Sequence, residues 1–250
     1  MFVGGYLFQK LSQTLLSKSQ MPLSTIVEVF MKVITVGTGS TGNCYLIERD
    51  NGHYIALDCG CPWKQVLIGC GFKPSMIDFA LVTHSHKDHS GYIRDFENSG
   101  IDVYDAEFFQ RYPRQTVRIG DVAFLGFELP HDVPCFGFLL QVDGHKIIYM
   151  TDFEYCKYTF KSHGVDTWLI ACNHVEAPNI EEEKYAHVVL GHSSLQTVKD
   201  ILTVNKTDKM KNIILCHYSA DADTEEMVAG IREVVGDIVH LAQKGKVVEI

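Results

Sequence analysis

The 250-residue sequence has no long hydrophobic run. No stretch approaches the roughly 20 consecutive apolar residues that a transmembrane helix needs. The apolar start at residues 1–8 lacks a basic segment, so the pattern of a secretory signal peptide is missing. Internal repeats and low-complexity segments are also absent. These absences exclude a transmembrane helix and repeat architectures, and they favour a globular protein.

Positive charge is scarce. Lys and Arg number 22 against 31 acidic residues, which gives a formal net charge of −9. Affinity for long nucleic acids depends largely on basic side chains that neutralise phosphates. The composition therefore argues against an extended basic surface for folded RNA or long duplexes. It leaves open a local basic pocket, or metal ions that recognise a phosphate.

The sequence has eight cysteines but no Cys-x-x-Cys pair of the kind found in metal and redox motifs. Cys59 and Cys61 are separated by one glycine, which is too close for that motif. Other cysteines, such as Cys172 and Cys216, lie within apolar runs. Free, buried thiols in a reducing compartment explain this pattern, so we expect a cytoplasmic protein.

One short segment, residues 83–91, concentrates potential metal ligands. Within six residues it holds His84, His86, Asp88 and His89. The apolar run 79–82 just before it predicts a buried strand, so these ligands follow the carboxyl end of a strand. Imidazole nitrogens and carboxylates suit zinc or a similar divalent ion. Alternation lets His84 and His86 face one ion, while Asp88 and His89 can face a second.

From residue 31 onward, short β-prone runs alternate with helical patterns. Strands are expected at 32–36, 44–48, 54–57, 79–82, 101–104, 116–119, 122–129, 136–142, 146–150, 166–171 and 213–216, with further short strands at the end. Helices are expected at 63–70, from the ligand segment to about 98, at 181–185, from 193 or 194 to about 204, and at 224–235. The pattern predicts an α/β domain that covers residues 31–250.

Residues 1–30 differ in composition from the rest of the chain, because Ser, Gln and Lys dominate after an apolar start. The segment that begins at Met31 resembles the start of a natural domain. We expect a flexible extension or a start-site artefact; a short helix packed on the domain or on a second subunit is the alternative. The Gly-rich turn at 37–43 is expected to close a hairpin, with Ser40 or Asn43 near the site mouth. A phosphate cradle is less favoured, because such cradles usually precede a helix.

The His-x-His-x-Asp-His segment resembles the metallo-β-lactamase superfamily, and later residues match further motifs of that superfamily. His131 follows a predicted strand in a His-Asp pair, Asp152 ends another after Thr151, and His217 ends the last core strand. Each alone could be a cap or surface residue. The resemblance implies an α/β fold, an αββα sandwich of two mixed β-sheets face to face, with helices outside and metals at one edge.

The resemblance also implies two divalent metal ions, with zinc expected and manganese or magnesium as alternatives. His84, His86 and His131 would bind the first ion; Asp88, His89 and His217 would bind the second; Asp152 would bridge them. In the superfamily, the position of Asp58 orients the ligand loop, although a carboxylate there could also cap the next helix.

Two further motifs indicate a branch of the superfamily. Residues 37–43 (GTGSTGN) resemble the opening of short YycJ-like members and of the ribonuclease Z branch. The Gly-His-Ser at 191–193 resembles a motif of ribonuclease Z-like phosphodiesterases, whose histidine contacts the scissile phosphate and pairs with an acidic residue. The resemblance therefore implies catalytic roles for His192, Glu176 and Asp88. His174 is left open between a supporting role at the site and a core position.

The implied function is phosphodiester hydrolysis by a hydroxide that bridges two metal ions. The segment from 131 to 152 has room only for a hairpin, so the arm with which ribonuclease Z grips tRNA is missing. The compact chain resembles the phage anti-Pycsar phosphodiesterase, which implies cyclic nucleotides such as cCMP and cUMP, a homodimer, and the host cytoplasm if the gene is phage-encoded. Alternatives are a YycJ-like DNA or RNA exonuclease, a hydrolase of non-phosphate esters, thioesters or lactams, and a metal-binding scaffold without activity.

Overall fold

The computed structural model describes residues 31–175 and 191–250. The predicted N-terminal extension (1–30), the candidate Glu176 and the predicted helical piece at 181–185 lie outside the described residues. Among the described helices, none combines the length and the apolar character needed to cross a membrane.

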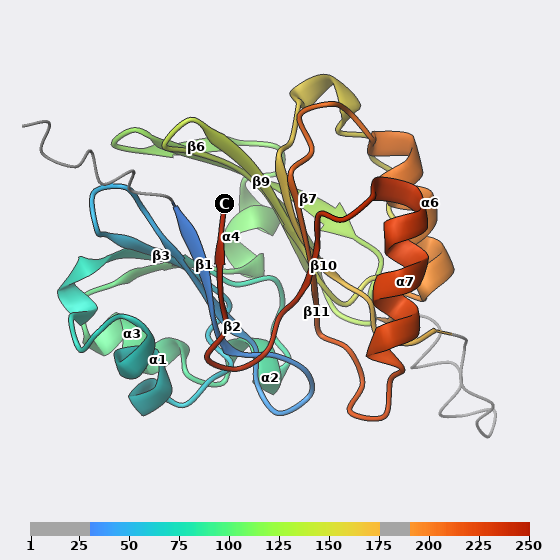
Figure 1. Ribbon diagram of the computed structural model, residues 1–250. Helices are drawn as coiled ribbons and strands as arrows, with labels where there is room; N and C mark the ends of the chain where they lie inside the picture. Colours follow the sequence, from blue (N-terminus) through green and yellow to red (C-terminus); the bar gives the residue numbers. More distant parts are fainter. Residues whose placement is uncertain (1–30, 176–190) are drawn as a thin grey trace, which may run out of the picture.

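Two mixed sheets form the body of the molecule (Figure 1). In spatial order, the first contains β13 (Val247–Glu249), β1 (Lys32–Gly37), β2 (Cys44–Glu48), β3 (Tyr54–Leu57), β4 (Ile77–Leu81) and β5 (Asp102–Tyr104). The second contains β12 (Val239–Leu241), β11 (Asn212–Cys216), β10 (Thr167–Ala171), β9 (His145–Met150), β8 (Cys135–Val142), β7 (Val122–Leu129) and β6 (Thr116–Ile119). The C-terminal segment connects them, because β12 pairs with β11 and β13 pairs with β1.

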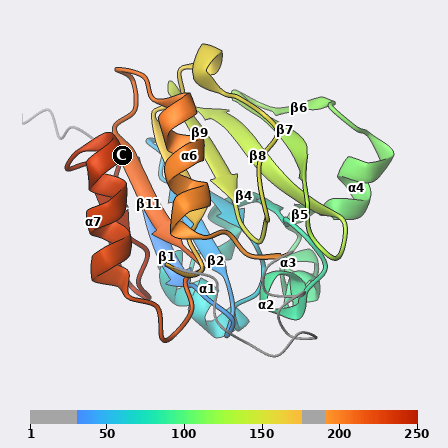
Figure 2. The same cartoon turned by 90° about the vertical axis from the view of Figure 1, so that its right-hand side faces the viewer.

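Helices cover the outer faces of the two sheets (Figures 1 and 2). The first sheet carries α1 (Trp63–Gly69) and α3 (Ile93–Asn98), and the second carries α6 (Leu195–Asn205) and α7 (Thr224–Val235). Shorter elements are α2 (Lys87–Ser90), α4 (Ala106–Arg111) and the 3₁₀ turns η1 (Pro74–Met76) and η2 (Lys161–His163). The layers thus match the predicted order of helix, sheet, sheet and helix.

Alternate side chains of one apolar strand contribute to two different apolar layers, one on each face of the sheet. In β4, Phe79 and Leu81 belong to the core between the sheets, whereas Ala80 and the following Val82 pack toward the helix layer of the first sheet. Successive side chains of a strand point to opposite faces. A strand buried on both faces therefore needs a continuous apolar run, which explains why residues 79–82 contain no polar residue.

Many strands end at the same edge of the sandwich. In the second sheet β9, β10, β11 and β12 are parallel, and β7 runs with them because β7 and β9 are both antiparallel to β8. In the first sheet β3, β4 and β5 are parallel. The carboxyl ends of β3, β4, β7, β9 and β11 lead directly to the polar residues singled out in the sequence.

The prediction of one continuous helix from the ligand segment to about residue 98 is wrong, because the structure has two separate helices there, α2 and α3. The Asp88 carbonyl accepts a hydrogen bond from Asn43 N at 2.7 Å, and Tyr92 N donates to the Cys59 carbonyl at 2.9 Å. The two groups that would form the helical bond between residues 88 and 92 are therefore both used by neighbouring loops. These bonds fix the ligand segment to the rest of the first sheet.

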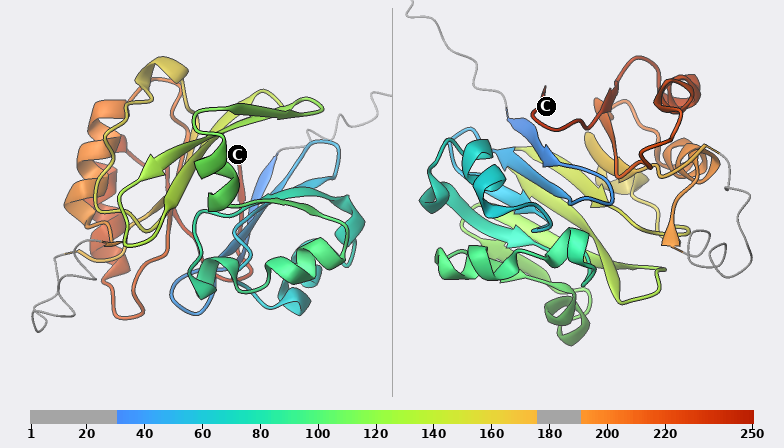
Figure 3. Two further views of the ribbon diagram at one scale, coloured as in Figure 1. Left: turned by 180° about the vertical axis from the view of Figure 1, so that it is seen from behind. Right: turned by 90° about the horizontal axis from the view of Figure 1, so that it is seen from below.

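One helix has no counterpart among the predicted elements. In α4, the Asp105 side chain caps the helix by accepting from Phe108 N at 3.0 Å. The helix packs on the second sheet through Phe109. A Cβ at Gly126 of β7 would lie 2.4 Å from Phe109 Cδ1, so glycine leaves the space that the ring occupies. Figure 3 shows α4 beside that sheet from behind. Six residues make a weak periodic signal, so the cap was the usable clue.

The Gly-rich turn forms the predicted hairpin. β1 and β2 are antiparallel, with a shift in register between Thr35 and Gly37. Gly42 has φ +142°, and a Cβ there would lie 2.4 Å from the Gly60 carbonyl oxygen. Glycine is therefore required where this turn passes the loop after β3. All eight cysteines are free, and seven of them are buried, as expected.

Candidate metal centre

Seven side chains from four separate segments converge at the common strand edge. Their potential ligand atoms fall into two groups, with all atoms of a group within 4.8 Å of one another: His84, His86 and His131, and then Asp88, His89, Asp152 and His217. The structure therefore brings together all seven residues that the superfamily resemblance implied. It places Asp152 with the second group.

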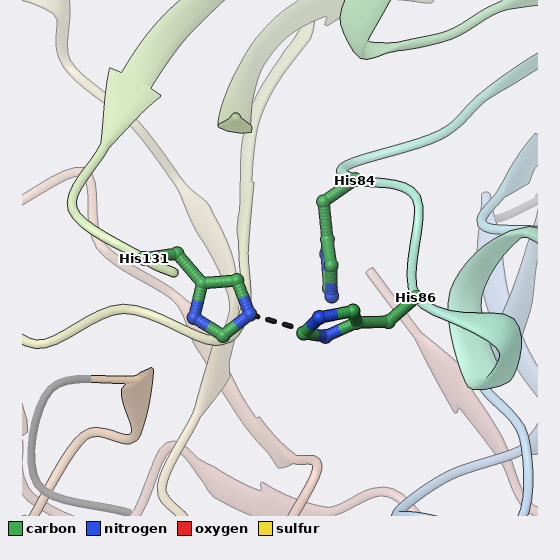
Figure 4. A group of neighbouring side chains, drawn as sticks. All are labelled: His84, His86 and His131. Carbon is green, nitrogen blue, oxygen red and sulfur yellow. Dashed lines mark hydrogen bonds between the residues drawn. The ribbon is translucent and has the colours of Figure 1, made fainter. Parts of the chain in front are cut away.

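The first group consists of three imidazoles (Figure 4). His84 and His86 come from the loop after β4, and His131 comes from the loop after β7. The Nε2 atom of His131 lies 3.3 Å from Nδ1 of His86, and the three rings point toward a common centre (Figure 4). Asp132, which the sequence reasoning did not select, approaches His131 Nε2 to 3.0 Å and His86 Nε2 to 3.4 Å.

The second group combines two imidazoles and two carboxylates. His89 Nε2 lies 2.9 Å from Asp152 Oδ2 and 3.3 Å from Asp88 Oδ2. His217 contacts the same carboxylates, with Nε2 3.3 Å from Asp88 Oδ2 and Nδ1 3.3 Å from Asp152 Oδ1. Asp152 Oδ2 also lies 3.5 Å from Nε2 of His84. Asp152 thus touches residues of both groups, which is the position expected of a shared ligand.

Asp58 supports the ligands from beneath. Its carboxylate is fully buried, accepts from Thr83 N (2.8 Å) and from the Thr83 hydroxyl (3.0 Å), and pairs with His89 Nδ1 at 2.6 Å. The Tyr149 hydroxyl also donates to it. These bonds agree with the orienting role that the resemblance implied for Asp58, rather than with a helix cap.

The Asp58 network also sets the tautomer of His84. The Thr83 hydroxyl has one proton, which it donates to Asp58, so its contact with His84 Nδ1 at 3.0 Å requires Nδ1–H as the donor. Nε2 of His84 then carries the lone pair. That atom is buried and has no hydrogen-bond partner within the described part of the chain. A buried nitrogen lone pair that faces other ligand atoms is suited to a cation.

The Asp58→Asn variant should therefore weaken metal binding without removing any residue of the two groups. An amide cannot accept from both Thr83 and His89 as a carboxylate does, so the orientation of both ligands is loosened. We expect a loss of about 10- to 100-fold in metal affinity, read by competition with a chromogenic chelator. Asp102→Asn, at an exposed position of β5, is the matched control. Unchanged affinity in Asp58→Asn would contradict the orienting role.

Two asparagines that sequence reasoning underused hold the second group. The Asn43 amide nitrogen lies 3.1 Å from His89 Nε2 and donates to Asp88 Oδ2 at 3.3 Å. The Asn173 amide lies 2.9 Å from His217 Nδ1 and donates to the His217 carbonyl at 2.9 Å. Both side chains are buried. The sequence signal that could have identified these two asparagines was their position, because each lies next to a turn or strand that ends at the site.

Three residues of the site have left-handed backbone conformations: Asp58 (φ 60°), Asp152 (φ 47°) and His217 (φ 48°). Asp58 and His217 directly follow the end of a strand, and Asp152 follows one residue later. Such conformations are uncommon for residues other than glycine, and they cluster at functional sites where the surrounding structure holds them. The sharp turn at each position directs the side chain back across the sheet edge toward the other ligands.

The electrostatics of the two groups differ. Burial, followed by the proximity of His89, lowers the pKa of His84 to about 2, so its ring is neutral at pH 7. Burial would also lower the pKa of His89, but the carboxylates of Asp58, Asp152 and Asp88 outweigh this effect and raise it well above the usual value. The carboxylates that favour a proton on His89 would equally favour a metal cation in its place.

A pocket of about 310 Å³ opens over the ligands. Its described lining includes His192 and contains no Lys or Arg. The lining residues are Ser40, His86, Asp88, His131, Asp152, Asn173, His192, His217, Tyr218, Ser219 and Ala220.

The His192 ring centre lies 6.2 Å from that of His217, and burial lowers the pKa of His192 to about 4. The preceding residue is Gly191, and a Cβ at this position would lie only 2.9 Å from the His131 ring. Glycine therefore allows this backbone to pass close to His131. His192 therefore lies beside the candidate ligands, and its catalytic role stays a prediction. Glu176, its suggested partner, lies outside the described residues.

The donor set fits a pair of divalent ions. Five imidazoles and two carboxylates, gathered around a common centre, match the ligand preferences of zinc, and manganese can use the same set. His174, which the sequence left open, pairs through its backbone with Ser194, and Leu195 N donates to its carbonyl at 2.9 Å. This bond anchors the start of α6 beside Asn173.

Comparisons with known proteins agree with this geometry. The family model of the metallo-beta-lactamase superfamily matches residues 37–104. Anti-Pycsar protein Apyc1 of Bacillus phage 010DV004 is 37% identical over 67 residues, which are 24% of this chain and 26% of that protein. Exodeoxyribonuclease WalJ of Streptococcus pneumoniae serotype 2 is 22% identical over 234 residues, covering 80% of this chain and 86% of that protein. The match to the phage protein thus spans about a quarter of its length.

The same fold recurs among solved structures. The metallo-beta-lactamase fold protein YhfI from Bacillus subtilis superposes with a TM-score of 0.69 at 18% identity, over 88% of this chain and 100% of that one. The family match covers the ligand segment and the turn at 37–43, and the structural match extends over most of the chain. Residues 37–104 thus resemble the metallo-beta-lactamase superfamily, and most of the chain has the fold of a metallo-beta-lactamase fold protein.

Proposed function

We propose that the protein is a metal-dependent phosphodiesterase with two divalent ions at the candidate metal centre. The observation that carries the proposal is the convergence of two ligand groups joined by Asp152 under a pocket that contains His192. When bound, the ions would make a water molecule nucleophilic near neutral pH and offset phosphate charge. Lys and Arg are absent from the described lining of this pocket, so among the described residues no basic side chain is placed there to offset the phosphate charge.

The chain's own residues would position the reaction. In this proposal, His84, His86 and His131 hold the first ion, Asp88, His89 and His217 hold the second, and Asp152 is shared. His192 contacts the scissile phosphate, whose negative charge would favour the protonated imidazole against the effect of burial. The protonated ring gives its proton to the departing oxygen. Asp58, Asn43 and Asn173 keep the ligands oriented through the bonds described above.

Cyclic nucleotides are the first substrate class in this proposal. The phage anti-Pycsar protein is a relative in sequence, and a pocket of about 310 Å³ suits a small molecule. β8 and β9 form a plain hairpin between His131 and Asp152, with no inserted arm for a folded RNA. The net charge of −9 also disfavours long polyanions.

Exonuclease action on DNA is the second candidate. The similarity to the WalJ exonuclease covers 80% of this chain, which is far more than the segment shared with the phage protein. A panel of cCMP, cUMP, short single-stranded DNA, bis(p-nitrophenyl) phosphate and nitrocefin separates the candidates. Turnover of cyclic nucleotides over DNA supports the first, and the reverse supports the second. Turnover of nitrocefin alone, or of no phosphodiester, would contradict the proposal.

The His192→Ala variant tests the proton donor. An alkoxide leaving group needs a proton, whereas p-nitrophenolate departs without one. We therefore expect kcat on a cyclic nucleotide to fall by about 100-fold or more, kcat on bis(p-nitrophenyl) phosphate to fall far less, and metal content to be unchanged. His163→Ala, a change in the η2 turn, is the control. Equal losses on both substrates, or full activity on both, would remove the assigned role.

Metal identity, assembly and location are further parts of the proposal. Zinc is the expected ion because imidazoles dominate the donor set. We also propose a homodimer and a cytoplasmic location, which is that of the host if the gene is phage-encoded. Metal analysis of the purified protein and light scattering measure the first two directly.

A further inference from the structure

A second depression borders the metal-ligand pocket on its His131 side. It measures about 460 Å³, and its lining residues are Gln110, Glu128, Leu129, Pro130, His131, Asp132, Val133, Pro134, Cys135, Phe136, Tyr155 and Lys157. His131 lines both hollows. A substrate whose phosphate lies over the ligands can therefore place an adjoining group in this second depression.

The second depression combines an apolar floor with a polar rim. Leu129, Cys135 and Phe136 are buried and belong to the core between the sheets. On the rim, Tyr155 is 52% exposed, and Lys157 Nζ lies 3.6 Å from Glu128 Oε2. An exposed aromatic ring beside hydrogen-bonding groups suits a flat heteroaromatic ring, which needs a stacking face and polar partners for its edge.

Tyr155 is held at this position by the backbone of the ligand loops. It lies three residues after Asp152, and between them Phe153 is fully buried while Glu154 N donates to the Pro130 carbonyl at 3.2 Å. That bond ties the loop after β9 to the residue before His131. The backbone before Tyr155 is therefore held beside the loop that carries His131, and both residues line the second depression.

We propose that this second depression is a nucleoside subsite, in which Tyr155 stacks on the base of the substrate. The assignment rests on the proposed phosphodiesterase function and specifies which part of the substrate is recognised away from the phosphate. Tyr155 acts in binding, and the reacting atoms stay over the metal ligands. Glu128 and Gln110 are placed to accept from or donate to the edge of the base.

Two substrates with the same leaving group test the subsite: thymidine 5′-(p-nitrophenyl phosphate) and methyl p-nitrophenyl phosphate. In Tyr155→Ala, KM for the thymidine ester should rise about 5- to 100-fold, because base stacking on an aromatic side chain has this strength. KM for the methyl ester should stay within about twofold, and Tyr155→Phe should keep the wild-type KM for both. Phe72→Ala, a second exposed aromatic far from the site, is the control.

The outcomes separate the subsite from the function. If the unaltered protein hydrolyses both esters and Tyr155→Ala changes neither KM, the subsite is overturned and the phosphodiesterase proposal stands. A parallel rise for both esters would place the effect on the leaving group or on the site as a whole, and would also overturn the nucleoside assignment. If the unaltered, metal-loaded protein hydrolyses neither ester, the proposed function falls and the subsite with it.

Discussion

Replacing Asp152 with alanine is expected to lower phosphodiester turnover by about 10³-fold or more, which is the largest functional effect that we predict. Asp152 contacts His84, His89 and His217, so it joins both ligand groups. Without its carboxylate the second group keeps one carboxylate against two imidazoles, and the proposed pair of ions would lose its shared ligand. Metal content per chain should fall together with turnover of bis(p-nitrophenyl) phosphate.

The Asp152→Asn variant separates the effect of losing the negative charge from the effect of disturbing the left-handed backbone at this position. Asparagine tolerates the left-handed φ of 47° at this position better than alanine does, so the fold is retained while the negative charge is lost. The turnover of this variant should be nearly as low as that of Asp152→Ala. Asp237→Ala, at a 93% exposed carboxylate after α7, is the control. If Asp152→Asn retained more than about a tenth of the activity and both ions, the bridging role would be wrong.

Replacing Arg49 with alanine is expected to cause the largest loss of stability. Arg49 follows β2 at the end opposite the ligands, and its side chain is only 5% exposed. Its guanidinium pairs with Asp78 of the first sheet at 3.0 Å, and with Asp143 and Asp121 in turns of the second sheet at 2.8 Å each. These carboxylates raise the pKa of Arg49 despite the opposing effect of burial.

Removing Arg49 leaves Asp78 and Asp143 close together without their cation. Breaking a buried ion pair on one side costs about 3 kcal/mol, which corresponds to a decrease of roughly 6–12 °C in Tm for a domain of this size. Arg232→Ala, which removes an exposed pair with Asp237, should change Tm by at most a few degrees. Turnover well below Tm should be unchanged in both. A Tm shift below about 2 °C in Arg49→Ala would mean that the sheets do not depend on this cluster.

The order of elements was readable from local patterns. Alternating and continuous apolar runs located the core strands to within a residue or two, because a strand buried on one or both faces leaves a period of two or an unbroken run. The failed predictions have causes that are distant in sequence. The helix after His86 is broken because Asn43 and Cys59 take the hydrogen bonds that would continue it, and both partners lie in loops distant in sequence.

By itself, the sequence determined the ligand types and their order along the chain, since His84, His86, Asp88 and His89 lie in one segment after an apolar strand. The superfamily resemblance implied that His131, Asp152 and His217 join them, but no local pattern did, because they meet only where strands from both sheets end at one edge. The tertiary structure decides this juxtaposition. It also decided the supporting roles of Tyr149, Asn173 and Arg49. Each of these looks like an ordinary strand or loop residue, and its role comes from a hydrogen bond to a group distant in sequence, which no local pattern records.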